Sequence, residues 1–101
     1  MKVLEGVLSE SRDYYIDAKK SIEGRLSSLP GGSVKERIIK GKKYYYHQQR
    51  RGKRVIHKYI GKEKPEPLLK QIKERKILEV ELKKVNEALH LLEKIGSKKH
   101  G

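Results

Sequence analysis

Tyrosine, histidine, glutamine and arginine are interleaved in one stretch, from Lys42 to Lys62, which reads KKYYYHQQRRGKRVIHKYIGK. Arginine, glutamine and histidine can hydrogen-bond to base edges, lysine and arginine bind phosphates, and tyrosine rings can stack. Neighbouring side chains of a strand point to opposite faces, so Tyr44, Tyr45 and Tyr46 cannot all face one core. At least one of these tyrosines must therefore face away from the core. The cationic, hydrogen-bonding and aromatic side chains of this stretch together suit binding to a polyanion.

The chain carries a large excess of positive charge. Its 101 residues hold 26 Lys plus Arg against 13 Asp plus Glu, a formal net charge of +13, and the pI is about 10.0. On so short a chain this excess favours an anionic partner, and we expect nucleic acid. A chain of this length also buries a limited fraction of its surface, which argues against a deep substrate cavity.

The residue types give little support for metal binding or catalysis. Cysteine is absent, and His47, His57, His90 and His100 are scattered, so we expect no metal site. Nearly every Asp and Glu has a Lys or Arg within four residues on a predicted surface, a pattern typical of helix ion pairs and not of acid–base catalysis. We therefore predict no catalytic residues, no cofactor and no enzymatic activity.

The sequence also bears on localisation. No stretch of apolar residues approaches the length that a membrane span needs. The first ten residues, MKVLEGVLSE, become charged early and lack the apolar core of a signal peptide. The absence of cysteine fits a reducing compartment. These features predict a cytoplasmic protein without a membrane partner.

Two long amphipathic helices are predicted on either side of the tyrosine-rich stretch. Over residues 2–29 apolar side chains recur every three or four positions, until an LPGG run ends the pattern. Residues 66–95 contain a heptad seam. The seam consists of Leu78, Leu82, Val85, Leu89 and Leu92. Ile77, Ala88 and Ile95 widen this arc beyond what one partner helix needs, so a homodimer through helix 66–95 is an open possibility beside simple core packing.

Between the helices the sequence favours strands. Three short segments are rich in β-branched residues and tyrosine: 34–39, 43–49 and 54–60. Each connection between them contains one glycine suited to a hairpin turn. We expect a three-stranded antiparallel β-meander over residues 34–60. The predicted fold is α+β, a single domain over residues 1–101 in which a helical hairpin carries the sheet, with a basic tail at 96–101.

The pairing of the strands decides which side chains share a face. Three-residue loops at both turns would place Val34 and Ile56 opposite Tyr46. The resulting core face would contain Val34, Ile38, Tyr44, Tyr46, Ile56 and Ile60. A two-residue turn at Gly41 would instead exchange the faces of the first strand.

In the three-residue register, the other face carries the groups that suit nucleic acid. Its members would be Lys35, Arg37, Tyr45, His47, Gln49, Val55, His57 and Tyr59. The rim would hold cations for phosphates, namely Lys42, Lys43, Arg50, Arg51, Lys53, Arg54 and Lys58. Apart from Val55, these residues are the predicted nucleic-acid-binding set. Such a face can enter the major groove of DNA, so we expect double-stranded DNA before RNA, with Tyr45 as the outward-facing tyrosine.

The chain resembles a known family over the stretch GGSVKERIIKGKKYYYHQQRRGKRVIHKYIGK. In this uncharacterised prokaryotic family of small basic proteins, a G-S-[LV] start, a K-x-Y-Y-Y strand, an R-x-G-K turn and a K-Y-I-G-K end precede a charged helix. The resemblance covers roughly residues 30–92 and implies no activity.

More loosely, the segment YYYHQQRRGKRV is similar to the arm-binding, three-stranded-sheet domains of phage and transposon integrases, and to N-terminal segments of some transposases. Those domains read DNA with the sheet face, which implies the same use of the sheet here. This chain has no catalytic domain and a longer N-terminal helix, so the resemblance implies a stand-alone accessory protein or regulator.

Two alternatives remain open at this point. Exposed aromatic residues and arginines also anchor protein interfaces, so the same face suits an inhibitor or assembly factor that docks on an acidic protein partner. Single-stranded RNA could also stack on the tyrosines.

Overall fold

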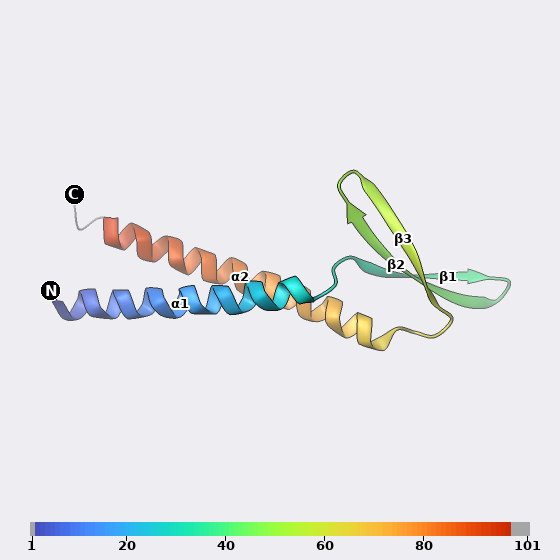
Figure 1. Ribbon diagram of the computed structural model, residues 1–101, viewed down its shortest axis with the longest axis horizontal. Coiled ribbons are helices and arrows are strands. Elements are labelled where there is room, and N and C mark those ends of the chain that lie inside the picture. Colours follow the sequence, from blue (N-terminus) through green and yellow to red (C-terminus); the bar gives the residue numbers. More distant parts are fainter. Residues whose placement is uncertain (1, 98–101) are drawn as a thin grey trace. The chain divides into compact units, whose positions relative to one another are not determined.

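The computed structural model of the protein describes residues 2–97. Its elements are α1 (Lys2–Ser28), β1 (Ser33–Ile39), β2 (Lys42–Arg51), β3 (Arg54–Gly61) and α2 (Glu66–Ser97), as Figure 1 shows. This order confirms the predicted α+β class, and each element begins and ends within two residues of its expected bounds. Most of the predicted basic tail, residues 98–101, lies outside the described residues.

The chain divides into two compact units. The helical unit contains the residues up to Ser28 together with those from Ile77 onward, and the sheet unit contains Leu29–Lys76. Helix α2 therefore contributes its first turns to the sheet unit and the remainder to the helical unit.

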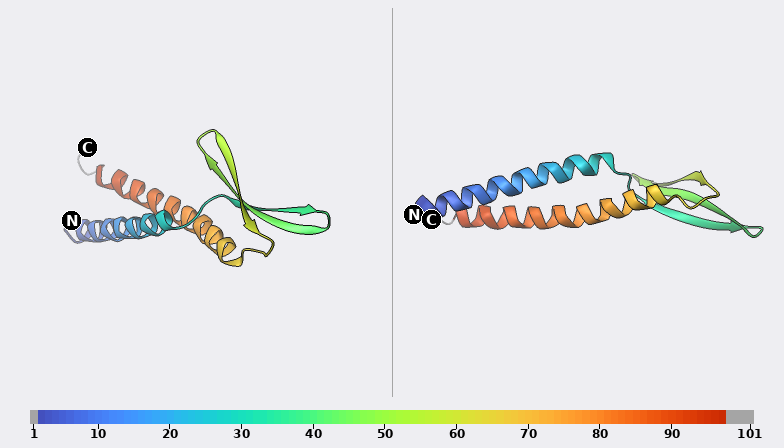
Figure 2. Two further views of the ribbon diagram at one scale, coloured as in Figure 1. Left: turned by 45° about the vertical axis from the view of Figure 1, so that its right-hand side comes forward. Right: turned by 90° about the horizontal axis from the view of Figure 1, so that it is seen from below.

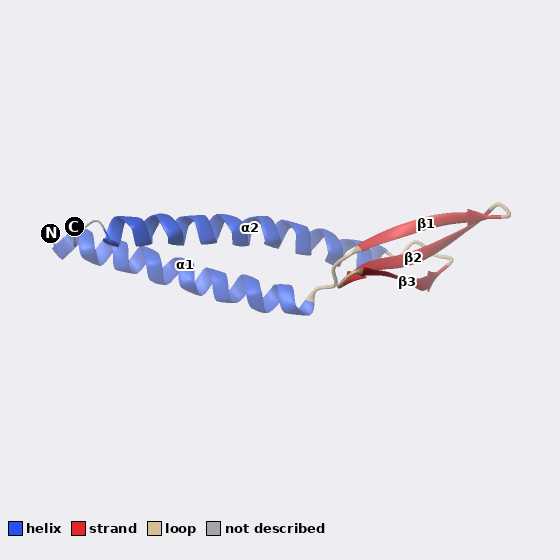
Figure 3. Ribbon diagram, turned by 90° about the horizontal axis from the view of Figure 1, so that it is seen from above, coloured by secondary structure: helices blue, strands red, loops and turns tan. Residues whose placement is uncertain are grey.

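Within the helical unit, α1 and the second part of α2 run antiparallel, as Figure 3 shows. The half-buried apolar side chains form one stripe on each helix, with Leu8, Tyr15, Ile22 and Leu26 on α1 and the predicted seam on α2. No described side chain of this unit is fully buried, because two helices cover only one stripe of each other. None of the described helices meets the length and apolarity that a membrane span requires.

The sheet unit contains the predicted antiparallel meander in the order β1-β2-β3. Both of its turns are shorter than expected, because Ile39 pairs with Lys42 and Arg51 pairs with Arg54. At the first turn Lys40 and Gly41 have φ angles of 51° and 78°, the pattern of a type I′ turn. Gly52, with φ of 62°, occupies the first central position of the second turn, as in type II′.

These two-residue turns overturn the expected strand register. Val34 lies opposite His47 and not Tyr46, while Tyr46 lies opposite Lys35 and Tyr59. The predicted pairing is thus off by one residue for β1 and by three for β3. Because side chains alternate with a period of two, both odd shifts exchange the faces of the outer strands relative to β2. The physical reason is that two-residue primed turns match the twist of the paired strands.

A small core holds the sheet unit together. Leu29 and Ile72 are the described residues that are buried, each only 6% exposed. The Arg75 guanidinium donates a hydrogen bond from Nη1 to the Leu29 carbonyl, with an N···O distance of 2.8 Å. Leu29, predicted as the last helical residue, thus belongs to the linker that joins α1 to the sheet and is anchored by the first turns of α2.

We expect Gly32→Ala to destabilise the sheet unit by about 2 kcal/mol, because Gly32 has φ of 83° and an added Cβ would meet the Gln48 carbonyl oxygen. Gly24→Ala is the matched control: it lies in α1 with open space around it and should gain about 0.5–1 kcal/mol of helix stability. Urea unfolding followed by NMR signals of each unit measures both effects. Equal stability of the Gly32→Ala variant and the wild type would contradict the described linker.

The observed register predicts that Lys40→Asn stabilises the first hairpin by several tenths of a kcal/mol, because Asn accepts positive φ more readily than Lys and Asn-Gly favours type I′ turns. Amide exchange of β1 and β2 measures this gain. Slower exchange in the variant is the expected result. Faster exchange would argue for the three-residue loop.

Candidate nucleic-acid interface

The positive charge of the protein is concentrated in one unit. Residues 29–76 hold 16 Lys and Arg against four Asp and Glu, a net charge of +12. Residues 2–28 and 77–97 together hold eight Lys and Arg against nine Asp and Glu, a net charge of −1. A polyanion would therefore be attracted to the sheet unit.

The observed register gathers three tyrosines on one face of the sheet, which we call the tyrosine face. It contains Lys35, Tyr46 and Tyr59, which are paired with one another across the three strands. Because side chains alternate along each strand, the same face also contains Ser33, Arg37, Ile39, Lys42, Tyr44, Gln48, Arg50, Val55 and His57. None of these twelve residues is acidic. The face thus combines cations, hydrogen-bonding groups and aromatic rings without a carboxylate to repel an anion.

The tyrosine rings of this face contact one another and two cations, Arg37 of the face and Lys62, which follows β3. The Tyr46 ring centroid lies 5.5 Å from that of Tyr59, with the ring planes inclined by 58°, and Tyr44 lies 6.3 Å from Tyr59. The Arg37 guanidinium carbon lies over the Tyr46 ring at 5.1 Å from its centroid, and Lys62 Nζ lies 6.0 Å from the Tyr44 centroid. These cation–π contacts hold positive charge against the rings.

The opposite face of the sheet, the histidine face, contacts the linker that follows α1. His47 is half-buried, and its Nε2 lies 2.7 Å from the Gly31 carbonyl oxygen. Because a carbonyl only accepts, Nε2 carries the hydrogen of this bond. On the same face Lys43 forms an exposed ion pair with Glu36, with an N···O distance of 3.4 Å. Tyr45 therefore lies on the face on which His47 contacts the linker and which carries Glu36, the acidic residue of the three strands.

The structure separates the predicted site residues into two groups. The tyrosine face receives Lys35, Arg37, Lys42, Arg50, His57 and Tyr59, whereas the histidine face receives Lys43, Tyr45, His47, Gln49, Arg51, Arg54 and Lys58. Lys53 lies in the second turn. The predicted grouping of Tyr45, His47 and Gln49 with Lys35, Arg37 and Tyr59 is therefore wrong.

Sequence reasoning assigned Tyr44 and Tyr46 to the core and overlooked Gln48 and Lys62. The signal that could have found them is the glycine in each turn, because X-Gly and Gly-X are the preferred pairs of two-residue hairpin loops. With two-residue loops, alternation alone places Tyr44, Tyr46 and Gln48 together with Arg37.

Cations also cluster at the two ends of the sheet, which we call the hairpin tips. The first tip has the exposed residues Lys40, Lys42 and Lys43, and the second has Arg50, Arg51, Lys53 and Arg54. Figure 2 shows the two hairpins diverging from the shared part of β2, as the twist of paired strands dictates. The tips thus present separate groups of positive charge at opposite ends of β2.

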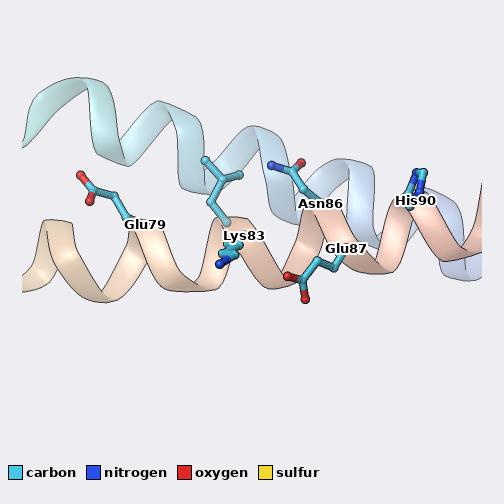
Figure 4. A pocket seen from close by; sticks show the side chains of 6 residues that line it. Glu79, Lys83, Asn86, Glu87 and His90 are labelled. Carbon is cyan, nitrogen blue, oxygen red and sulfur yellow. The ribbon is translucent and has the colours of Figure 1, made fainter.

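The helical unit offers a different kind of surface. A shallow groove is lined by Glu79, Leu82, Lys83, Asn86, Glu87 and His90, all from α2, and Figure 4 shows its polar side chains along the helix. Its carboxylates Glu79 and Glu87 are eight residues apart, or about 12 Å along the axis, which is too far to act on one reacting atom. Among residues 2–97, no three potential metal ligands gather at one point.

A comparison with protein families gives one match. A family described as a domain of unknown function (DUF6788) matches residues 15–74, a segment that includes the whole sheet and the first turns of α2. Comparisons with curated proteins and with solved structures gave no match. Because the matched residues make up more than half of the chain and include the entire tyrosine face, the protein belongs to the DUF6788 family, whose function is uncharacterised.

Proposed function

We propose that the protein binds double-stranded nucleic acid, DNA before RNA, through the tyrosine face and the hairpin tips, as an accessory or regulatory protein. The observation that carries this proposal is the concentration of a net charge of +12 in residues 29–76, together with a sheet face that has no carboxylate. Phosphate contacts provide a large share of the affinity of such proteins and fix their position on the duplex.

The arrangement of the cations favours a duplex. The major groove of DNA is about 12 Å wide and admits a two-stranded ribbon, with phosphates along both of its edges. Positive tips at both ends of β2 suit contacts to both backbones, while Arg37, Gln48 and His57 carry groups that can hydrogen-bond to bases between them. Arginine in particular can bind guanine through two hydrogen bonds.

The tyrosine contacts argue against single strands as the preferred ligand. Proteins that bind single strands stack bases on open aromatic rings. Arg37 already lies over the Tyr46 ring, and Lys62 lies near the Tyr44 ring. A stacking base would have to displace these cations, whereas a duplex backbone can bind them where they are.

A protein partner is the second candidate, and the edge strand β3 favours it. Val55 and Tyr59 are each 50% exposed, and Ile56 and Ile60 are also exposed. Exposed apolar residues on an edge strand suit pairing with a strand of another protein. An acidic partner would then be selected by the charge of the sheet unit, and the protein would act as an inhibitor or assembly factor.

We expect the double variant Lys35→Ala/Arg37→Ala, on the tyrosine face, to weaken binding to a labelled random DNA duplex about tenfold or more, because it removes two charges from the binding surface. The matched control is Arg12→Ala/Lys20→Ala, which removes the same charges from exposed positions of α1 and should weaken binding less. Fluorescence anisotropy over a salt series measures both. Equal losses in the two variants, or an affinity that does not fall with salt, would contradict the proposal.

Competition experiments separate the ligand classes. We expect duplex DNA to displace the labelled duplex at a concentration at least about tenfold lower than single-stranded RNA does, because the Tyr44 and Tyr46 rings already hold cations. Preferential displacement by single-stranded RNA would favour the stacking alternative. A stoichiometric protein that survives nuclease treatment in a pull-down would instead favour the protein-partner alternative.

A further inference from the structure

The second part of α2 has an exposed stripe that the contact with α1 leaves open. It consists of Ile77, Val80, Lys84, Glu87, Leu91 and Ile95, which we call the outer stripe. At 3.6 residues per turn these six positions lie within about 80° of one another around the helix. Its four apolar side chains form one pair on each side of Lys84 and Glu87 and are 47–58% exposed. Exposed apolar patches mark interaction surfaces.

Most of the outer stripe lies away from the α1 contact, and Lys84 lies at its edge, beside a hollow that α1 also lines. The seam residues of α2, such as Leu82 and Leu89, are half-buried, whereas the residues of the outer stripe are exposed. Glu87 points away from α1 in Figure 4. Packing of the two helices therefore leaves the outer stripe available to another molecule.

The order of residues along the outer stripe is palindromic. Two apolar residues, Ile77 and Val80, are followed by Lys84 and Glu87, and then by the apolar residues Leu91 and Ile95. An antiparallel second copy, related by a two-fold axis between Lys84 and Glu87, would place each Lys84 opposite Glu87 of the other copy. The same axis places Val80 opposite Leu91, and Ile77 within one residue of the position opposite Ile95. A two-fold interface requires such self-complementarity.

From this pattern we propose that the helical unit forms a two-fold symmetric homodimer, in which the outer stripes of two copies of α2 pack antiparallel. The charge of the unit permits it, because residues 2–28 and 77–97 carry a net charge of only −1 and do not repel their copies. The two helices leave Ile77, Val80, Leu91 and Ile95 of the outer stripe about half exposed, and contact with a second copy would cover them.

Helix α1 extends the same surface. A second hollow of the helical unit is lined by residues of both helices, among them Tyr14 of α1 and Lys84 of the outer stripe. Tyr14 is 69% exposed, and Val7, one heptad earlier, is 52% exposed. The dimer would cover these side chains beside the outer stripe. This inference does not depend on the proposed nucleic-acid binding, because only the helical unit takes part.

Cysteine cross-linking tests the proposed geometry directly, since the natural chain has no cysteine. In the Val80→Cys/Leu91→Cys double variant, each new thiol faces a thiol of the second copy, so mild oxidation should convert most of the protein to a covalent dimer. Within one copy the two positions are about 16 Å apart along the helix, which excludes an internal disulfide. Val80→Cys alone is the matched control and should give little dimer. Equal cross-linking of the single and double variants would overturn the antiparallel geometry.

A charge exchange tests the centre of the interface. In analytical ultracentrifugation without nucleic acid, Lys84→Glu should raise the dimer dissociation constant about tenfold or more, because it places like charges opposite each other. Lys84→Glu/Glu87→Lys should return it to within about threefold of wild type. Lys20→Glu makes the same charge change at an exposed position of α1, outside the outer stripe, and should have little effect. A wild-type protein that stays monomeric at every concentration, or a double variant that does not recover, would overturn the proposal.

Discussion

The backbone conformation of the Lys40-Gly41 turn determines what the sheet can do. Positive φ at both residues closes the first hairpin with two residues, and this pairing places Arg37 opposite Tyr44 and diagonal to Tyr46. In this register the Arg37 guanidinium lies over the Tyr46 ring. A longer loop would move Arg37 to the other face and bring Glu36 beside the tyrosines. The character of the tyrosine face thus depends on one turn.

The two units differ in net charge, and this difference suits them to different partners. Helices with nearly balanced charge can approach other helices, while a sheet unit with a net charge of +12 repels a copy of itself and attracts anions. The proposed dimer through the helical unit and the proposed ligand of the sheet unit are compatible for this reason. A dimer would also bring two basic sheets into one molecule, and linked binding sites raise the apparent affinity for a long polyanion.

The helices were the most predictable part of the fold, and the strand register was the least. A helical stripe is defined over many turns, so one misplaced residue changes little in the assignment of seam residues such as Leu82 and Leu89. A strand has a period of two, and an error of one residue in a turn reverses every assignment on the strand. For this reason Tyr45 and His47 were grouped with the wrong neighbours, although both were correctly placed in the central strand. The role of Leu29 was also missed, because its spacing continues the helical pattern while its contact with Arg75 is made across 46 residues of sequence.

The sequence by itself determined the order of the elements, the concentration of cations between the helices and the palindromic order of residues on α2, because composition, periodicity and the position of glycine are local properties. Only the tertiary structure decided which tyrosines stand with Arg37, that His47 bonds to the linker at Gly31, and that Leu29 and Ile72 form the buried core of the sheet unit. The physical reason is that hydrogen bonding and burial join residues distant in the chain. Several pairings satisfy the local preferences, and the twist of the closed turns selects one of them.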